Sequence, residues 1–263
     1  MIAYFQNVKS LYGYKDLLYT WAYRIVRARY QQSVLGGLWA IIVPITTTLI
    51  FSVIFTFFIP VNTGNTPYLV FSYTAMVPWT FFSSSITDMV DSLTGNMNLV
   101  SKIYFPREIL PIASLIARLV DAFIAYIILA ILMVYYKMPV TISGLLLLPF
   151  ILVIQIALSL GIGFMGGALN VFYRDIRHVF VLGLQLWFYA SPIIYPVTAV
   201  PENLRSLYYL NPMAGVLEAY RAILIYHTLP GPSIYYSAGV SILALVIGYW
   251  VFKRLEFQFA DII

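Results

Sequence analysis

Residues 29–44 read RYQQSVLGGLWAIIVP and join two segments of opposite character. The segment before the join carries Arg24, Arg27 and Arg29 among aromatic and aliphatic residues, whereas residues 35–59 carry no charge. About 20 consecutive apolar residues are enough to cross a bilayer as a helix, and basic residues collect on the cytoplasmic side of such a span. The join therefore predicts a membrane protein whose chain enters the bilayer from the cytoplasm.

The composition of the whole chain supports this interpretation. Of its 263 residues, 62% are hydrophobic and only 10% are charged, and the mean hydropathy is +0.88. Soluble domains have about 25% charged residues, so this chain has too little polar surface to cover a globule in water. The chain has no cysteine, which excludes disulfides and thiolate chemistry. The net charge of +5 does not indicate nucleic-acid binding, because most of the basic residues flank apolar segments.

The hydropathy pattern predicts an all-α membrane protein with about six spans. They cover residues 35–59, 68–87, 111–136, 145–171, 179–196 and 234–252. Basic residues gather in the N-terminal segment, in the second and fourth connections and at the C-terminal end, so we expect both termini in the cytoplasm. The first residues lack the apolar core and small-residue cleavage site of a signal peptide. We expect a cytoplasmic interface segment over residues 1–34 and one transmembrane domain over residues 35–263.

Two further segments have helical patterns but are not expected to cross the membrane. Residues 16–32 combine an apolar stripe with a basic face, which is typical of a helix lying in the membrane interface. Residues 197–232 contain a helix start at Asn211 and Pro212 that an apolar stripe follows. We expect two short helices there, over residues 202–210 and 212–226, that dip into the outer leaflet or lie on it.

No catalytic signature is present, so we expect no catalytic residue, metal site or cofactor on this chain. His178 and His227 are predicted to lie on opposite sides of the membrane, and no phosphate-binding glycine-rich loop occurs. Arg118 and Asp121 are the charges well inside a predicted span, three residues apart, and can pair. An internal ion pair is the expected role, and a place along a conduit is the alternative. Small residues four apart at positions 159, 163 and 167 predict close helix packing.

Two features suggest surfaces for binding. The loop over residues 96–110 is more apolar than solvation requires, although it is expected in the cytoplasm, which indicates a docking surface. Aromatic residues inside the predicted spans could stack on sugar rings, although contact with lipid is the commoner reason for any one of them. The candidates for lining a conduit are Phe51, Phe55, Trp79, Trp187 and Tyr189.

Four stretches together carry a family resemblance. They are residues 29–44, residues 98–111, residues 170–196 with NVFYRDI and SPIIYP, and residues 210–221 with LNPMAGVLEAYR. In this order they resemble the transmembrane subunit of ABC exporters for lipid-linked polysaccharide, such as O-antigen, capsule or teichoic acid. The resemblance implies a homodimer in a bacterial inner membrane, joined by two copies of an ATPase subunit that holds ATP and Mg. The implied substrate is an undecaprenyl-linked glycan, surrounded by membrane lipid, with no nucleic acid involved.

The resemblance also implies roles for named residues. The segment over residues 197–232 would form an outer gate, through Tyr208, Asn211, Pro212 and Tyr220. The basic interface helix would meet the lipid phosphate, through Arg24, Arg27 and Arg29. The loop over residues 96–110 would couple to the ATPase, through Asn98, Leu99, Ser101, Lys102, Tyr104, Arg107 and Glu108.

Other functions remain open at this point. Within transport, the cargo could be a teichoic acid, a capsular polymer or a small molecule. An integral-membrane enzyme acting on glycans would need acidic residues clustered at one membrane face, and the sequence has no such cluster. A channel without an ATPase would not need the apolar loop over residues 96–110.

Overall fold

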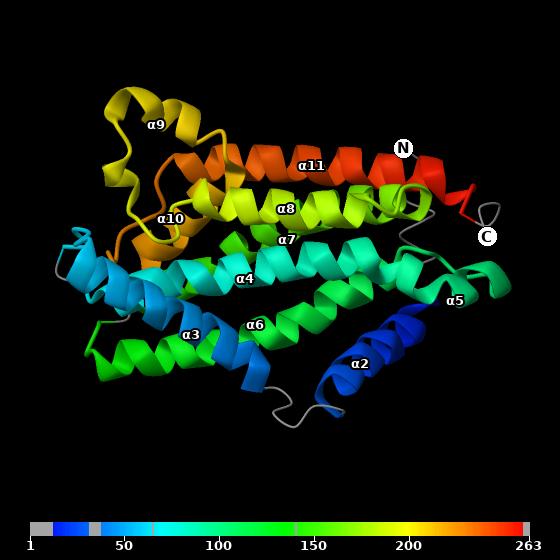
Figure 1. Cartoon of the computed structure of the whole chain (residues 1–263), viewed down its shortest axis with the longest axis horizontal. Coiled ribbons are helices and arrows are strands. Elements are labelled where there is room, and N and C mark those ends of the chain that lie inside the picture. The colour runs from blue at the N-terminus through cyan, green and yellow to red at the C-terminus, as the bar shows by residue number, and fades with distance from the viewer. Residues whose placement is uncertain (1–12, 32–37, 65, 140, 260–263) are drawn as a thin grey trace.

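The computed structural model describes residues 13–31, 38–64, 66–139 and 141–259 (Figure 1). Within these ranges the chain forms ten α-helices and no strand, which confirms the all-α prediction. The long helices are α2 (Lys15–Gln31), α3 (Trp39–Val53), α4 (Tyr68–Ser92), α6 (Ile109–Tyr135), α7 (Ile142–Phe172), α8 (Ile176–Tyr189) and α11 (Ser233–Glu256). The short ones are α5 (Met97–Lys102), α9 (Glu202–Tyr208) and α10 (Pro212–Leu224), with π-helical η2 (Ile54–Phe58) and 3-10 turns η3 (Thr94–Asn96) and η4 (Val197–Ala199).

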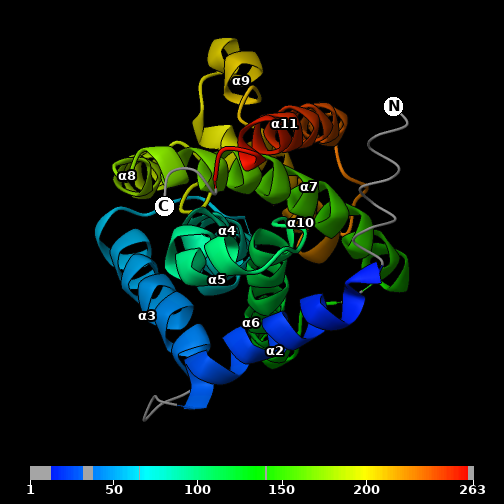
Figure 2. The ribbon, with the colours of Figure 1, turned by 90° about the vertical axis from the view of Figure 1, so that its right-hand side faces the viewer.

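Helix α4 is the centre of a lengthwise bundle. It is buried along most of its length and packs against α3, α6, α7, α8 and α10. In Figure 1 α4, α6, α8 and α11 run along the long axis, with α5 and the last turns of α11 at one end and α9 and α10 at the other. Helix α2 lies obliquely across α6 near the first of these ends (Figures 1 and 2).

Charge divides the two ends of the bundle. The end near α5, which we call the basic end, carries Lys102, Arg107, Arg174, Arg177, Lys253 and Arg254. The opposite end, which we call the far end, carries Lys137, Arg205 and the buried Arg221 of α10. This is the asymmetry expected of a membrane protein whose basic end faces the cytoplasm.

Among the residues that the structure describes, three helices are long and apolar enough to cross a membrane: α6, residues 144–172 of α7, and α11. Large apolar side chains are exposed along them, among them Phe123 and Ile131 on α6 and Ile242 and Val246 on α11. Exposing such long apolar faces to water is unfavourable, whereas contact with lipid chains is not. The chain is therefore a multi-pass membrane protein.

The predicted fifth span, residues 179–196, is wrong at its C-terminal end. Helix α8 has 14 residues and ends at Tyr189, which is shorter than the roughly 20 residues that a crossing helix needs. The chain then turns through Ser191 and Pro192. Proline has no N–H for the helix and disfavours a helical conformation in the residue before it, which explains why the helix ends here. The sequence stays apolar beyond this point, so hydropathy alone placed the end of the span too late.

The predicted first span is regular only in part. Helix α3 ends at Val53 and continues as the π-helix η2 to Phe58, while residues 32–37 lie outside the described residues. Helices α4, α6, α7 and α11 match the four other predicted segments within about five residues, but α4 is not one of the three helices that are apolar enough to cross, so the count of six spans stays a prediction.

The small residues of α7 pack closely against two neighbours, as the sequence predicts. Gly161 and Gly248 bring the backbones of α7 and α11 together, and a Cβ on either glycine would overlap the other helix. Gly163 and Gly167 face Met89 of α4. The stripe therefore serves packing within the fold.

The two short helices predicted between the last spans are also present. Asn211 caps α10, because its side chain accepts a hydrogen bond from the Met213 amide at 3.0 Å, and Pro212 occupies the first turn. Helix α10 is buried among α4, α7 and α11, so it is inserted into the bundle at the far end.

Candidate functional site

Four charged side chains from three helices meet where α2 crosses the bundle. Arg29 of α2 and Arg118 of α6 both bind Asp88 of α4, at 2.8 Å from Arg29 Nη2 and 2.7 Å from Arg118 Nε to its Oδ2. Both arginines also pair with Asp121, with 3.1 Å between Arg118 Nη1 and Asp121 Oδ2. We call these four residues the charge cluster. Its formal charges cancel, so a partly buried position leaves no uncompensated ion.

Tyr30 extends the charge cluster by one hydrogen bond. Its hydroxyl donates to Asp121 Oδ1. Burial, together with this bond to a carboxylate, raises the pKa of Tyr30 to about 12, so the hydroxyl is a protonated donor at neutral pH. The sequence predicted the contact between Arg118 and Asp121 but not the participation of Asp88 and Tyr30.

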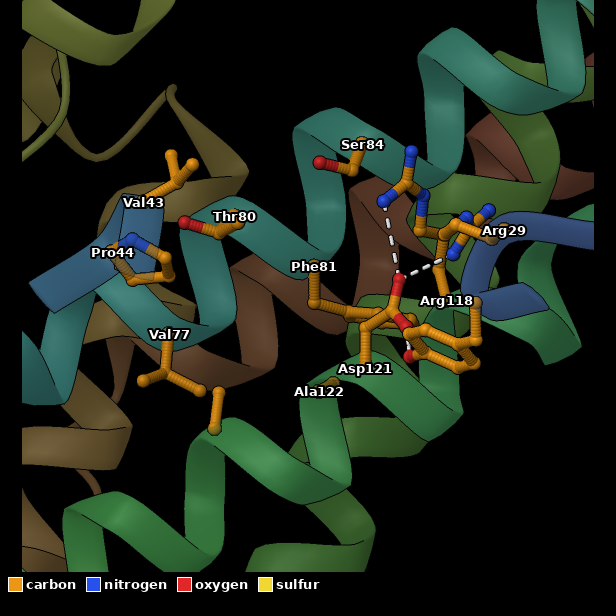
Figure 3. Close-up of a pocket in the computed structure, with 12 residues that line it drawn as sticks. Arg29, Val43, Pro44, Val77, Thr80, Phe81, Ser84, Arg118, Asp121 and Ala122 are labelled. Atoms are coloured by element: carbon orange, nitrogen blue, oxygen red, sulfur yellow. Dashed lines mark hydrogen bonds and ion pairs between the residues drawn. The ribbon is translucent and has the colours of Figure 1, made fainter. Parts of the chain in front are cut away.

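The charge cluster forms the polar wall of a cavity of about 280 Å³ between α2, α3, α4 and α6. Figure 3 shows Arg29 of α2 and Arg118 of α6 both pointing at Asp121 of α6, with Ser84 of α4 nearby. The remaining walls are mainly apolar and are made by Val43, Pro44, Val77, Phe81, Ala122 and Ala125. An aliphatic chain with a polar head would suit such a lining.

Three further cavities border α8: the first two also have α4 residues in their lining, and the third lies between α8 and the segment around α9. The first, of about 700 Å³, lies at the basic end and includes Asp91, Asn170, Arg174, Arg177 and His178 in its lining. The second, of about 410 Å³, lies in the middle, and its lining includes Trp79, Ser83, Ser84, Thr87, Gln185 and Tyr189. The third, of about 440 Å³, lies beside α9, and its lining includes Trp187, Leu204, Leu207, Tyr208 and Asn211.

These three cavities lie in sequence along the bundle. Thr87 and Asp91 are one turn apart on α4, and Val181 and Arg177 are one turn apart on α8, so the basic cavity adjoins the middle one. The third cavity shares no lining residue with the middle one, but Trp187, which lines the third cavity, lies 6.4 Å between ring centroids from Trp79, which lines the middle one. We call this row the α4–α8 lane. Arg118 and Ser84 border both the lane and the cavity of the charge cluster.

Most of the aromatic residues proposed for a conduit gather beside the lane. Trp79 lies 5.8 Å from Phe188 and 6.4 Å from Trp187, measured between ring centroids. Phe51 of α3 stacks on Phe188 at 6.0 Å. Tyr189 lines the middle cavity and is exposed. Phe55 lies apart from the lane and stacks on Tyr68.

The residues proposed for coupling divide into two groups. Asn98, Lys102 and Tyr104 are exposed at the basic end, and Tyr104 has 95% of its surface free. Leu99 is partly buried, and Ser101 lies in α5 with its side chain outside what the structure describes. Helix α5 thus presents an exposed face, as a docking surface requires.

The other two coupling candidates are tied to α11. Glu108 is only 1% exposed and accepts bonds from Lys253 and from the Tyr249 hydroxyl, the latter at 3.2 Å. Arg107 donates to the backbone carbonyl of Glu256. The sequence contained no signal for these contacts, because the partners are about 145 positions apart along the chain. They join the loop after α5 to the end of α11.

The outer-gate candidates hold the turn after α8 in place. Asn211 donates to the carbonyl of Ala190 at 3.1 Å and to Ser191 Oγ at 2.9 Å, and accepts from Trp187 Nε1 at 2.8 Å. Tyr208 donates to the Tyr195 hydroxyl at 3.0 Å. Tyr220, in contrast, is buried against Gln155 of α7, 3.2 Å between its hydroxyl and Oε1.

A buried arginine that the sequence did not single out completes this arrangement. Arg221 is 2% exposed and donates to the carbonyls of Pro192 at 2.6 Å and Ile193 at 2.8 Å. Its guanidinium also lies 3.7 Å from the Phe71 ring of α4. Arg221 forms no ion pair with Glu218, three positions earlier on α10, whose carboxylate accepts a hydrogen bond from Tyr209.

The arginines proposed for the lipid phosphate have different surroundings. Arg29 belongs to the charge cluster, where two carboxylates already bind its guanidinium. Arg24 lies 4.7 Å from the Trp21 ring, and Arg27 donates to Gln31 at 3.0 Å on an exposed face. A role in phosphate binding stays a prediction for all three. No cluster of three His, Asp or Glu residues that could hold a metal occurs among the described residues.

An all-α membrane protein with a polar and aromatic lane through its bundle is the class that this geometry defines. The chain belongs to the ABC-2 type transporter family, whose profile matches residues 16–225.

Curated relatives cover nearly the full chain. It is 31% identical over 258 residues to the O-antigen export system permease protein RfbA of Myxococcus xanthus, covering 97% of this chain and 98% of that one. It is 29% identical over 250 residues to the protein of the same name from Klebsiella pneumoniae, covering 94% and 95%. It is 27% identical over 242 residues to the polysialic acid transport protein KpsM of Escherichia coli, covering 89% and 91%.

Proposed function

We propose that this chain is the transmembrane subunit of an ATP-driven ABC exporter that carries a lipid-linked polysaccharide of O-antigen type across a bacterial inner membrane. Membership of the ABC-2 type transporter family and the relatives named as O-antigen export permeases support this proposal. The single observation in the structure that carries it is the α4–α8 lane.

The lane has the chemistry that a moving glycan needs. Ser83, Thr87 and Gln185 offer hydroxyl and amide groups that exchange hydrogen bonds with sugar hydroxyls. Trp79 and Tyr189 offer aromatic faces, which contact sugar rings without demanding one fixed orientation. Such a lining allows a polymer to slide, whereas a small solute would need one closed and specific pocket.

The proposed topology has six spans with both termini in the cytoplasm. The helices in order are α3 with η2, α4, α6, α7, α8 with the turn after it, and α11. The basic end then faces the cytoplasm, in agreement with the distribution of Lys and Arg. The short helix α8 is compatible with crossing because residues 190–196 would lie within protein, where irregular backbone at membrane depth is tolerated.

We further propose that two copies of the chain form the transporter, with two copies of a separate ATPase subunit. Helix α8 buries only Leu184 and exposes Val181, Gln185 and Tyr189. A polar lane beside an exposed helix is costly in lipid, so a second copy facing it would enclose the lane as a conduit.

Coupling to ATP is proposed to run through α5. The exposed Tyr104 and Lys102 would dock on the ATPase, and closure of its two subunits would move α5 and the helices joined to it as rigid bodies. The two conformations must bind the glycan with different affinities for this motion to do transport work. ATP and Mg belong to the partner subunit, and no enzymatic role falls to this chain.

The cargo has one alternative with specific support. The relative named as a polysialic acid transport protein is similar over most of the chain, so a capsular polymer is the second candidate. A teichoic acid would use the same lane. A small molecule would not need a lane that runs from the basic end to the far end.

Transport by the reconstituted complex tests the proposal. The chain and its ATPase subunit are placed in proteoliposomes with a fluorescent polyprenyl diphosphate glycan in the outer leaflet. We expect ATP-dependent protection of the glycan from an added glycosidase, lost in Thr87→Val/Gln185→Leu and kept in Phe123→Ala on the lipid-facing side of α6. Equal protection without ATP, or full protection by the Thr87→Val/Gln185→Leu variant, would refute the assignment.

A further inference from the structure

The basic cavity at the end of the lane has features that neither packing nor coupling explains. It is the largest of the cavities described above, at about 700 Å³, and lies between the ends of α4, α7 and α8. Two arginines and a histidine from residues 174–178 line it, together with Asp91, Thr94 and Asn170. A pocket of this size holds a ligand of several non-hydrogen atoms rather than a single ion.

The charge of the cavity favours an anion. Arg177 pairs with Asp91 at 3.3 Å between Nε and Oδ2, and both side chains are partly exposed. No described carboxylate pairs with Arg174, and His178 is exposed beside it. Helix α8 begins at Ile176, so the positive end of its dipole lies at the same place. The lining carries two arginines and one carboxylate, while Asp175, between the two arginines in the chain, is not part of the lining. A phosphate group would therefore find two guanidinium groups within one turn.

The opposite wall offers a different partner. Asn170 of α7 is 3% exposed, and its Nδ2 donates to the Val90 carbonyl at 3.0 Å and to Thr94 Oγ1 at 3.1 Å. Its Oδ1 is buried and has no hydrogen-bond partner among the described residues. A buried acceptor without a partner is costly, and an anion cannot satisfy it. A hydroxyl group, as on a sugar, can donate to it when the Asn170 side chain turns this oxygen toward the cavity.

We propose that this cavity binds the glycosyl diphosphate of the lipid-linked substrate before translocation. Arg174 and Arg177, with His178, hold the diphosphate, and Asn170 Oδ1 accepts a hydrogen bond from the first sugar. The middle cavity begins one helical turn away, at Thr87 of α4 and Val181 of α8, so the sugar chain would point toward the rest of the lane. The inference rests on the proposed function and assigns the loading site to the start of α8 rather than to the arginines of α2.

Binding by the full-length chain in lipid nanodiscs tests this assignment. The probe is a fluorescent polyprenyl diphosphate that carries one N-acetylhexosamine, and the competitors are inorganic pyrophosphate, a nucleoside diphosphate sugar and a polyprenol without phosphate. We expect the probe to bind, pyrophosphate to compete weakly, and the polyprenol not to compete. A nucleoside diphosphate sugar that competes as well as an unlabelled lipid diphosphate sugar would show a soluble nucleotide site and overturn the assignment to lipid-linked substrate.

Variants separate the two arginine groups. Arg174→Gln/Arg177→Gln should weaken probe binding by at least about tenfold, because it removes charge-assisted hydrogen bonds. Arg24→Gln/Arg27→Gln makes the same change in charge on α2 and should leave binding within about twofold. If Arg24→Gln/Arg27→Gln weakened binding more than Arg174→Gln/Arg177→Gln, the proposal would be wrong and the diphosphate site would lie at α2.

The sugar contact has its own test. Asn170→Ala should weaken the probe with sugar about tenfold more than the same lipid diphosphate without sugar. A general loss of folding would lower both equally, so equal losses contradict the role of Asn170. A wild-type chain that binds no lipid diphosphate would refute the proposed function itself, whereas binding that ignores Arg174 and Arg177 refutes only this site.

Discussion

Arg29 of α2 and Asp88 of α4 are 59 positions apart in the chain, and their side chains form an ion pair at 2.8 Å. Asp88 also binds Arg118 of α6, so one carboxylate joins three helices. The contact fixes α2 to the two helices that flank the segment around α5. A displacement of α2 must therefore move α4 and α6 or break charged hydrogen bonds in an apolar environment.

Replacing Asp88 with asparagine should loosen this junction. Asp88→Asn removes the carboxylate shared by Arg29 and Arg118 and leaves Asp121 to compensate both. We expect the free energy of unfolding to fall by about 2 kcal/mol, because hydrogen bonds to charged groups contribute about 1.5 to 3 kcal/mol. The melting temperature of the purified protein in detergent should fall by roughly 5 °C.

The matched control removes a carboxylate from an exposed pair. Glu202 lies 3.4 Å from Arg205 and its side chain is 88% exposed. Surface pairs contribute about 0 to 1 kcal/mol, so Glu202→Gln should melt like the wild type. If both variants melted at the wild-type temperature, the charge cluster would not hold the helices together.

The charge cluster also shows where prediction from sequence reached its limit. Helical spacing paired Arg118 with Asp121, because residues three apart share a face. Asp88 sits one residue beyond the end of the predicted second span, so hydropathy gave no reason to place it inside the bundle. The partners come from three helices, and single-sequence patterns contain no information on which helices meet.

For the fold, too, local sequence patterns predicted the helices but not the contacts between them. Apolar length located α6, α7 and α11 within a few residues, because lipid exposure requires continuous apolar faces. It failed at α8, where the apolar composition continues through Pro192 after the helix has ended. It also could not foresee the bond between Glu108 and Lys253, which depends on tertiary packing.

The contact between α7 and α11 gives a second prediction. A Cβ on Gly161 would overlap the backbone of Ala244, so Gly161→Ala must push the helices apart. Overpacking of this kind typically costs about 1 to 3 kcal/mol. Thermal unfolding in detergent should show this loss. Gly183→Ala is the control, because a Cβ there meets nothing within 4 Å; equal stability of the two variants would contradict the close approach of α7 and α11.

The bond between Glu108 and Lys253 gives a third prediction. Glu108→Gln and Lys253→Met each break a contact between the loop after α5 and α11. If α11 shares in coupling, each variant should keep the ATPase subunit bound but lose most of the substrate stimulation of ATP hydrolysis. The exchanged pair Glu108→Lys/Lys253→Glu should recover part of it. Normal stimulation in both single variants would exclude α11 from the coupling path.

The absence of cysteine in the chain allows a direct test of topology. Tyr104 at the basic end and Leu229 at the far end are both strongly exposed, so cysteine at either position should react with a thiol reagent. In intact spheroplasts a membrane-impermeant reagent should label Leu229→Cys only. In inverted vesicles it should label Tyr104→Cys only. Labelling of both positions from the same side would exclude the proposed six-span arrangement.

Arg221 gives the last prediction, because it has no carboxylate partner among the described residues and is held by carbonyl groups instead. Its guanidinium binds the carbonyls of Pro192 and Ile193 and lies over Phe71, so it joins α10, the turn after α8 and the start of α4. Lysine keeps the charge but offers a single donor group without the planar fork. Arg221→Lys should therefore release the turn without removing the charge.

The release of the turn can be observed through a cysteine at Ile194, the residue that follows the two carbonyls. We expect thiol labelling of Ile194→Cys to increase about tenfold in the Arg221→Lys background, since loss of a charged hydrogen bond shifts a local equilibrium by that amount. Arg205→Lys is the control, because Arg205 is partly exposed at the far end and bonds to the carbonyl of Val200. Unchanged labelling in Arg221→Lys would mean that Asn211 and Tyr68 suffice to hold the turn, through their bonds to the carbonyls of Ala190 and Ile194.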